Sequence, residues 1–309
     1  MYDNDSVHPR EQADQTAQAC NSTYQSEKSM PYVAEISRSN PSCFLFLIDQ
    51  SGSMRDPFGA SATNKNKANG VADAINRLLQ NLVIKCAKSE GIRDYYYVGV
   101  IGYGGKGVAP AFSGALNGRE LVPISEIGNN PARVEQRSKK MEDGMGGIIE
   151  QSVKFPIWFD PLAEGGTPMC EALNKGTNIL VKWLTTHPNC FPPIVINISD
   201  GESTDGDPYQ LASDLMSLTS TDGEVLLFNL HISSSNHAPV EFPDTDANLP
   251  DDHAKLLFNM SSHLPEYMRR IIGNEGIDVS FNTRGFVFNA DLVSVIRFLD
   301  IGTRPSNLR

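Results

Sequence analysis

The chain has 309 residues, of which 40% are hydrophobic and 20% are charged, as in ordinary folded globular proteins. A formal net charge of -11 and a pI near 5.0 disfavour nucleic acid as a direct partner, because binding to phosphates depends on clustered lysine and arginine. The start of the chain has no basic and apolar leader and the apolar runs are far shorter than a membrane span, so we expect a cytoplasmic protein that makes no contact with a membrane.

Residues 1–38 are polar and poor in aromatic side chains, which predicts a flexible N-terminal arm. We expect one domain over residues 39–303 and a short C-terminal tail over residues 304–309. The cysteines are odd in number and widely spaced, which favours reduced thiols over a disulfide scaffold or a zinc site. They are Cys20, Cys43, Cys86, Cys170 and Cys190.

Within the domain, short apolar runs alternate with segments of helical periodicity. The predicted strands cover residues 42–48, 95–103, 193–199, 224–232 and 285–289, and residues 108–112 are expected to return as an antiparallel edge strand. The predicted helices cover residues 68–86, 168–185, a segment beginning at Pro208, 265–272 and a terminal segment to about Leu299. This alternation indicates an α/β fold, doubly wound, with a mostly parallel central sheet and helices on both faces.

Two long segments interrupt the alternation. Residues 113–160 carry mixed charge and scattered glycine and proline, with one predicted helix over residues 133–141. Residues 233–255 are acidic and loop-like, and they follow the end of a predicted strand. Loops of this length usually have a function or are disordered.

Three oxygen-rich turns fall where predicted strands give way to helices. The first places Asp49, Ser51 and Ser53 on alternate positions, the second contains Thr167, and the third contains Asp200. The carboxyl ends of parallel strands share one sheet edge, so these oxygens are expected to converge. A small hard cation such as Mg²⁺ prefers such ligands. If the two aspartates act mostly through water, the ion stays incompletely neutralised and attracts a carboxylate from another molecule.

The same residues carry a family resemblance. Asp49-x-Ser51-x-Ser53, the Thr167 of GGTP and the Asp200 of ISDGESTDGD resemble the metal-ion-dependent adhesion site (MIDAS) of von Willebrand factor A (VWA) domains. The resemblance spans about residues 41–300, and ISDGESTDG is similar to bacterial intracellular members, including the tellurium-resistance-associated type. The stretch between Ser53 and Thr167 is longer than is usual in the family, so we interpret residues 113–160 as an insertion.

The resemblance implies a non-enzymatic module that binds Mg²⁺ or Mn²⁺ and a protein partner. Ser51, Ser53 and Thr167 would be direct ligands, while Asp49 and Asp200 would orient bound water. An Asp or Glu of the partner would complete the coordination. The resemblance further implies an adaptor or regulator in a bacterial stress, defence or phosphosignalling system, with an AAA+ ATPase or a kinase and PP2C-type phosphatase as possible companions.

One alternative function stays open, and two further sequence patterns also have a purely structural interpretation. A metal-dependent phosphohydrolase with Asp49 as its nucleophile is the main alternative function. The G-x-G-x-x-G pattern at residues 102–107 is interpreted as a hairpin turn, because no helix follows it to receive a dinucleotide. Thr167 before Pro168 is also a possible helix cap.

The acidic residues outside the motif also allow two interpretations. Glu202, Asp205 and Asp207 lie in a turn that we interpret as solvated rather than calcium-binding, because the EF-hand spacing is absent, and Asp207 before Pro208 is interpreted as a helix start. An acid of the 233–255 loop is alternatively expected to reach the metal and hold the module closed. The candidates for this role are Asp244, Asp246, Asp251 and Asp252.

Overall fold

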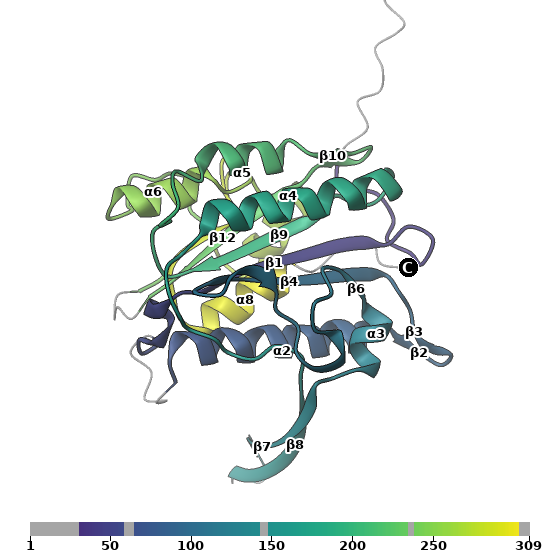
Figure 1. Cartoon of the computed structure of the whole chain (residues 1–309). Helices are drawn as coiled ribbons and strands as arrows, with labels where there is room; N and C mark the ends of the chain where they lie inside the picture. The colour runs from purple at the N-terminus through teal and green to yellow at the C-terminus, as the bar shows by residue number, and fades with distance from the viewer. Residues whose placement is uncertain (1–30, 59–64, 143–147, 234–237, 303–309) are drawn as a thin grey trace, which may run out of the picture. The chain divides into compact units, whose positions relative to one another are not determined.

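The computed structural model describes residues 31–58, 65–142, 148–233 and 238–302. Its central sheet has the order β13-β14-β12-β9-β1-β4-β5, with β6 also paired to β4 (Figure 1). The strands of this sheet are β1 (Ser42–Gln50), β4 (Tyr96–Gly104), β5 (Gly107–Pro110), β6 (Val122–Pro123), β9 (Ile194–Ser199), β12 (Leu226–Ile232), β13 (Val240–Glu241) and β14 (Phe286–Ala290). The five central strands are parallel, while β5, β6 and β13 are antiparallel to their neighbours.

Helices cover both faces of the sheet. In Figure 1, α4, α5 and α6 lie over one face, and α2, α3 and α8 lie over the other. The bounds of the helices are α2 (Lys67–Cys86), α3 (Ile124–Asn129), α4 (Met169–Thr186), α5 (Tyr209–Met216), α6 (Asp252–Asn259), α7 (Glu266–Asn274) and α8 (Leu292–Gly302), with short 3₁₀ turns at Gly52–Arg55 and Gly114–Leu116. The doubly wound α/β architecture predicted from the sequence is thus observed.

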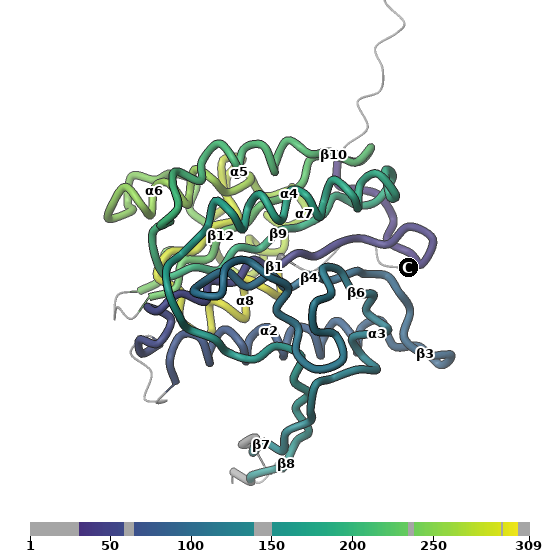
Figure 2. Tube along the Cα trace, viewed as in Figure 1, coloured from purple at the N-terminus to yellow at the C-terminus, as the bar shows by residue number. Residues whose placement is uncertain are grey.

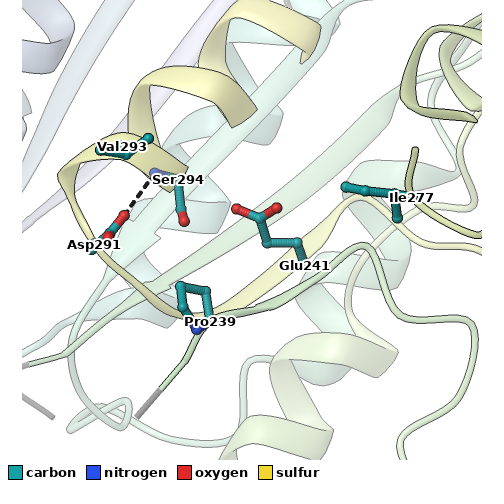
Figure 3. Close-up of a pocket in the computed structure, with 6 residues that line it drawn as sticks. All are labelled: Pro239, Glu241, Ile277, Asp291, Val293 and Ser294. Carbon is teal, nitrogen blue, oxygen red and sulfur yellow. Dashed lines mark hydrogen bonds between the residues drawn. The ribbon is translucent and has the colours of Figure 1, made fainter. Parts of the chain in front are cut away.

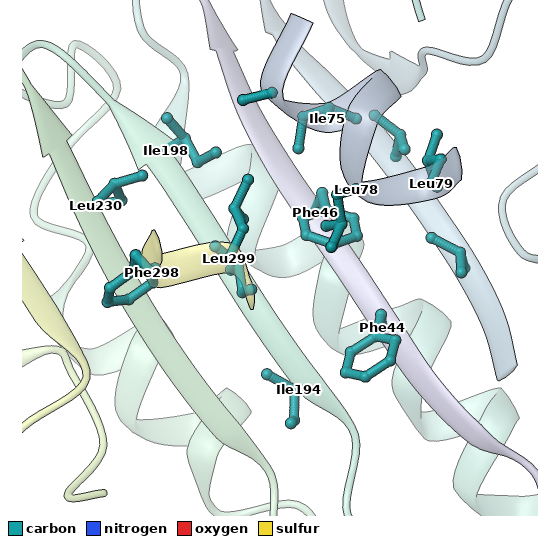
Figure 4. Close-up of a cluster of buried hydrophobic side chains, with 14 of the residues drawn as sticks. Phe44, Phe46, Ile75, Leu78, Leu79, Ile194, Ile198, Leu230, Phe298 and Leu299 are labelled. Carbon is teal, nitrogen blue, oxygen red and sulfur yellow. The ribbon is translucent and has the colours of Figure 1, made fainter. Parts of the chain in front are cut away.

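Strand β1 lies at the centre of the sheet and is buried throughout. Because side chains alternate along a strand, Phe44, Phe46 and Ile48 join the core beneath α2 and α8. Figure 4 shows Phe44 and Phe46 in this core. Cys43, Leu45 and Leu47 join a second core beneath α4, α5 and α6. A continuous apolar run is the expected sequence of a strand that is covered on both faces.

Most predicted elements are confirmed with small shifts at their ends, and the path of the chain between them can be followed in Figure 2. The antiparallel return after the glycine-rich turn is β5, paired with β4 from Gly104↔Gly107 to Ile101↔Pro110. The sequence did not predict α3, α6 or the antiparallel strand β13 at the other edge of the sheet. These elements are short, with at most 8 residues each, so their periodic signal is weak.

The helix predicted over residues 133–141 is wrong. This segment is strand β7 (Arg133–Glu142), which pairs antiparallel with β8 (Ile148–Ile157). The charged residues of β7 have good helix propensity, but propensity is a weak guide when tertiary contacts compete. The side chains of Phe155 and Ile157, two positions apart on β8, are both buried. The guanidinium of Arg137 lies 3.9 Å from the centre of the Phe155 ring. The hairpin projects beyond α2 in Figure 1.

The predicted boundary between residues 38 and 39 lies within the described residues, whereas the one between residues 303 and 304 lies outside them. Residues 1–30 of the arm and the tail at 304–309 lie outside them. Residues 32–38, which the prediction assigned to the arm, already pack on the domain, because Ile36 is buried and the backbone N–H of Ala34 donates to Asp222. The packed domain therefore begins several residues before position 39.

Among the described residues, no helix has both the length and the apolarity needed to cross a membrane. Cys43, Cys86, Cys170 and Cys190 are buried free thiols, whereas Cys20 lies outside the described residues. Burial raises the pKa of the Cys86 thiol to about 12 and that of Cys190 to about 11. These two thiols therefore belong to the apolar core rather than to reactive chemistry.

Candidate metal centre

Two of the three oxygen-rich turns leave adjacent strands of the central sheet, and the third lies between β8, which is outside this sheet, and α4. Asp49 lies near the carboxyl end of β1, and Asp200 directly follows β9, the parallel neighbour of β1. Thr167 precedes α4, which packs on β1 and β4. The five residues predicted for the site are therefore brought to a common region by the sheet topology.

Asp49 is the most deeply buried member, with an exposed fraction of 0%. One carboxylate oxygen accepts the backbone N–H of Ser51 at 2.8 Å, and the other accepts the hydroxyl of Ser199 at 2.8 Å. Burial raises the pKa of Asp49, and the nearby charge of Asp200 adds to this rise, against the effect of the hydrogen bonds. A cation beside this carboxylate would offset the electrostatic cost of its burial.

A chain of hydroxyl groups connects β1 to the turn after β9. The Ser51 and Ser53 hydroxyl oxygens are 3.0 Å apart, and the Ser53 hydroxyl donates to Asp200 Oδ1 at 2.7 Å. Ser51 is buried, whereas Ser53 is exposed. The site therefore has a closed inner side and an accessible outer side.

Thr167 approaches the same region from the second turn, which precedes α4. A side chain built at Gly201 would lie 3.8 Å from Thr167 Oγ1 and 4.0 Å from Ser53 Oγ, so both hydroxyls border the space beside Gly201. The backbone of Thr167 is fixed by Thr204, which accepts the Thr167 N–H on its hydroxyl and donates its own N–H to the Thr167 carbonyl, both at 2.9 Å. Two loops that are far apart in sequence are thus held together at the site.

The glycine-rich turn after β4 supports the Thr167 loop. Glu164 donates its N–H to the Gln50 carbonyl at 2.6 Å and accepts the Gly105 N–H at 2.5 Å. Gly165 has a φ of +73°, and a Cβ there would collide with the backbone of Gly105. The predicted hairpin turn is confirmed, and its glycines also allow the close approach of the loop that carries Thr167.

The side chain of Thr167 is not the cap of α4. Helix α4 begins at Met169, and Asp205 accepts the N–H groups of Cys170 and Glu171 at 3.0 and 2.9 Å. Asp205 is therefore bonded to a helix N-terminus rather than only solvated, and Asp207 likewise accepts the Tyr209 N–H. Burial opposes ionisation of Asp205, but these hydrogen bonds outweigh it and lower its pKa.

The donors at this edge have the chemistry that a small hard cation requires. They are two carboxylates and three hydroxyls, all of them oxygen ligands. Within the described residues, no three side chains of the His, Cys, Asp or Glu type form a metal-binding group. A cation here would consequently depend on the hydroxyls of Ser51, Ser53 and Thr167 together with the two aspartates.

Sequence reasoning missed three residues of the site. Ser199 binds Asp49, Thr204 fixes Thr167, and Lys67 donates to Asp200 Oδ2 at 2.7 Å. Ser199 and Thr204 lie inside the quoted ISDGESTDGD motif, so their nearness to Asp200 was a usable signal. Lys67 had no such signal, because a lysine at the start of a helix usually points into solvent.

The acidic residues of the 233–255 segment have other contacts. Asp244 accepts the Ser280 hydroxyl at 2.9 Å, and Asp251 caps α6 by accepting the Ala254 N–H at 2.8 Å. The segment is also not a single loop, since it contains β13 and the start of α6. These contacts give no support to the hypothesis that the segment occupies the metal centre.

A surface pocket of about 350 Å³ lies between β13 and the start of α8 (Figure 3). Its lining includes Glu241, which pairs with Arg297 at 2.7 Å, and Asp291, which accepts the Ser294 N–H at 2.8 Å. Both acids thus serve local structure. None of the six lining residues belongs to the predicted metal centre.

No protein-family model matches the chain, and no curated protein matches it. Among solved structures, proximal thread matrix protein 1 from the mussel byssus is 15% identical with a TM-score of 0.44, covering 87% of this chain and 48% of its own. The vWF domain of the type V pili tip protein Mfa5 from Porphyromonas gingivalis is 14% identical with a TM-score of 0.26, covering 53% of this chain and 39% of its own. The present chain thus spans less than half of these two neighbours. Structures this distant establish neither a family nor a function for it.

Proposed function

We propose that this chain is a VWA-type, non-enzymatic interaction module that binds Mg²⁺ or Mn²⁺ at the edge formed by Asp49, Ser51, Ser53, Thr167 and Asp200. The ion would supply a positive centre for a carboxylate of a partner protein. The observations that carry the proposal are the hydrogen-bonded chain of Ser51, Ser53 and Asp200, and the hydroxyls of Ser53 and Thr167, which both border the space beside Gly201.

The pattern of burial supports an ion that is held from its inner side and has a coordination position open to solvent. Asp49 and Ser51 are buried and would hold the inner side, whereas the exposed Ser53 lies toward solvent. Hydroxyls are neutral ligands, so they leave more positive charge on a bound dication than carboxylates would. That remaining charge would favour an Asp or Glu side chain from the partner.

Metal binding is tested first, by isothermal titration of the full chain with MgCl₂ and MnCl₂. The wild type should bind, and Thr167→Ala should lose most of the affinity because one hydroxyl ligand is removed. Thr185→Ala is the matched control, since Thr185 lies near the C-terminal end of α4, the helix that follows Thr167, and its hydroxyl donates to the Val181 carbonyl. Equal binding by wild type and Thr167→Ala would exclude Thr167 as a ligand.

Partner binding is tested by pulldown from cells with the same three proteins. The wild type and Thr185→Ala should retain a partner in Mg²⁺ and release it in EDTA, while Thr167→Ala should not retain it in either buffer. Identical partners in all samples would contradict a metal-dependent interaction. The identity of the retained protein would also test two further proposals. One is the cytoplasmic location expected from the amino-acid sequence, and the other is the companion implied by the family resemblance, an AAA+ ATPase, a kinase or a PP2C-type phosphatase.

The alternative function, a phosphohydrolase with Asp49 as nucleophile, has less support. Asp49 is completely buried, and both of its carboxylate oxygens accept hydrogen bonds. A nucleophile needs access to the phosphorus atom, which these contacts oppose. Hydrolysis of p-nitrophenyl phosphate by the wild type and not by Asp49→Asn would reverse this preference.

A further inference from the structure

Lys67 is the first residue of α2, and its side chain is buried against the metal centre. Its ammonium nitrogen lies 2.7 Å from Asp200 Oδ2 and 3.8 Å from Asp56 Oδ2. The side chains of Lys67 and Asp200 are 6% and 0% exposed, whereas that of Asp56 is 59% exposed. The buried partner of Lys67 is therefore Asp200.

The backbone holds Lys67 in this position. The Lys67 N–H donates to the Asp56 carbonyl at 3.0 Å, and Asn66 caps α2 by accepting the Asn69 N–H at 2.8 Å. Pro57 and Asn66 also form an isolated β-bridge. The segment after Ser53 is thus tied to the start of α2, so the lysine is presented to the site by fixed structure rather than by a mobile side chain alone.

Asp200 joins Lys67 to the hydroxyl ligands. Its Oδ1 accepts the Ser53 hydroxyl, while its Oδ2 accepts the Lys67 ammonium, both at 2.7 Å. Lysine is among the residues that are least often buried, and an unpaired buried ammonium is costly. The buried ammonium of Lys67 is therefore stabilised by the carboxylate of Asp200. The buried carboxylate of Asp200 in turn requires a cation beside it to offset the cost of its desolvation.

We propose that Lys67 is a resident counter-cation of the metal centre, which fixes Asp200 when the dication is absent and weakens the site's affinity for the dication. This inference rests on the proposed metal-binding function. The two aspartates provide the negative charge of the site, and Lys67 cancels part of it. A dication at the site is therefore attracted by less negative charge and is repelled by the nearby Lys67 ammonium. The carboxylate of a partner would neutralise part of the added positive charge.

The test compares Lys67→Met and Lys67→Gln with the wild type. Met keeps the length of the side chain without its charge, and Gln is a second replacement that tolerates polar surroundings. Lys65→Met is the matched control, because Lys65 is 46% exposed and pairs with Asp73 rather than with the site. Circular dichroism at the working temperature establishes that each protein is folded before titration.

Two measurements are expected to change in opposite directions. In isothermal titration with MgCl₂ alone, both Lys67 variants should bind about tenfold more tightly than the wild type, because a repelling charge is gone. In EDTA, both should unfold at a lower temperature than the wild type, because Asp200 has lost its cation. Lys65→Met should match the wild type in Mg²⁺ affinity.

The outcomes separate this inference from the proposed function. Tighter Mg²⁺ binding together with a lower melting temperature in EDTA supports the counter-cation role. If the wild type binds Mg²⁺ and the Lys67 variants bind equally or more weakly, the inference is wrong while metal binding stands. If neither the wild type nor any folded variant binds Mg²⁺ or Mn²⁺, the proposed metal function itself is overturned.

Discussion

The sheet edge that carries the candidate metal centre, here called the edge, and the β7–β8 hairpin are built in opposite ways. At the edge, hydrogen bonds join residues that are far apart in sequence, such as Asp49 with Ser199 across 150 positions and Ser53 with Asp200 across 147. In the hairpin, the two strands pair mainly with each other. The edge is consequently a product of the whole fold, whereas the outer hairpin is a local addition.

This difference has a physical consequence. Distant contacts form only when the sheet is complete, so the edge shares the cooperativity of the core. An isolated two-stranded hairpin is marginally stable in water, and β7–β8 has contacts with the domain near its base, where Arg137 pairs with Asp73 at 2.7 Å. Changes at the edge should therefore affect the whole domain, and changes far out on the hairpin should stay local.

The largest effect is expected from Gly165→Ala. The new methyl group would collide with the backbone of Gly105 and would also strain a residue whose φ is +73°. We expect the free energy of unfolding to fall by about 3 kcal/mol, with loss of Mg²⁺ binding because Thr167 is displaced. Urea denaturation and isothermal titration measure the two effects.

Gly107→Ala is the control for backbone strain. Gly107 has a φ of +80°, but a Cβ there meets nothing within 4 Å. Strain alone should cost about 1 kcal/mol and leave Mg²⁺ affinity unchanged. If both variants lose the same stability and keep their metal affinity, the close approach of the two turns does not position Thr167.

An intermediate effect is expected from His231 on β12, whose ring stacks on Phe288 with centroids 4.6 Å apart. Burial, followed by the charge of His253, lowers the pKa of His231 from 6.5 to about 4. Between these values the unfolded chain binds a proton here and the folded chain does not, so stability must fall as the pH drops. His231→Phe should reduce the loss of unfolding free energy between about pH 7 and about pH 5 by roughly 2 kcal/mol.

The measurement for His231 is urea denaturation at both pH values. Phe keeps an aromatic ring against Phe288 but cannot take up a proton. His253 and His263 also have pKa values lowered chiefly by burial, so part of the pH dependence should persist in the variant. An unchanged difference between the two pH values would show that His231 does not contribute to the pH dependence.

The smallest effect is expected from shortening the hairpin. Arg137 and Val153 are paired across the strands, so an Asn-Gly turn can join them in place of residues 138–152. We expect the free energy of unfolding to change by no more than about 1 kcal/mol and Mg²⁺ affinity to stay the same. Loss of metal binding in the shortened protein would show that the hairpin and the edge are coupled.

The contrast between the two regions also explains what the sequence could predict. The sheet and the positions of Asp49 and Asp200 were predictable, because apolar runs mark buried strands and parallel strands share a carboxyl edge, whereas Thr167 follows no strand of that sheet. Lys67 was not, since its burial depends on the fold of the Asp56 loop and on a carboxylate 133 positions away. Strand β7 was mispredicted because its local composition favours a helix, while its strand conformation depends on pairing with β8, a separate segment of the chain.

The alternation of side chains along β1 links the two halves of the molecule to the site. Phe46 and Leu47 face opposite cores, and Asp49 ends the same strand next to Tyr103 of β4. Inserting or deleting a single residue in β1 would exchange the large aromatic and smaller aliphatic groups between the cores. The same slip would turn the Asp49 carboxylate to the other face of the sheet, so the candidate site depends on the number of residues in this strand.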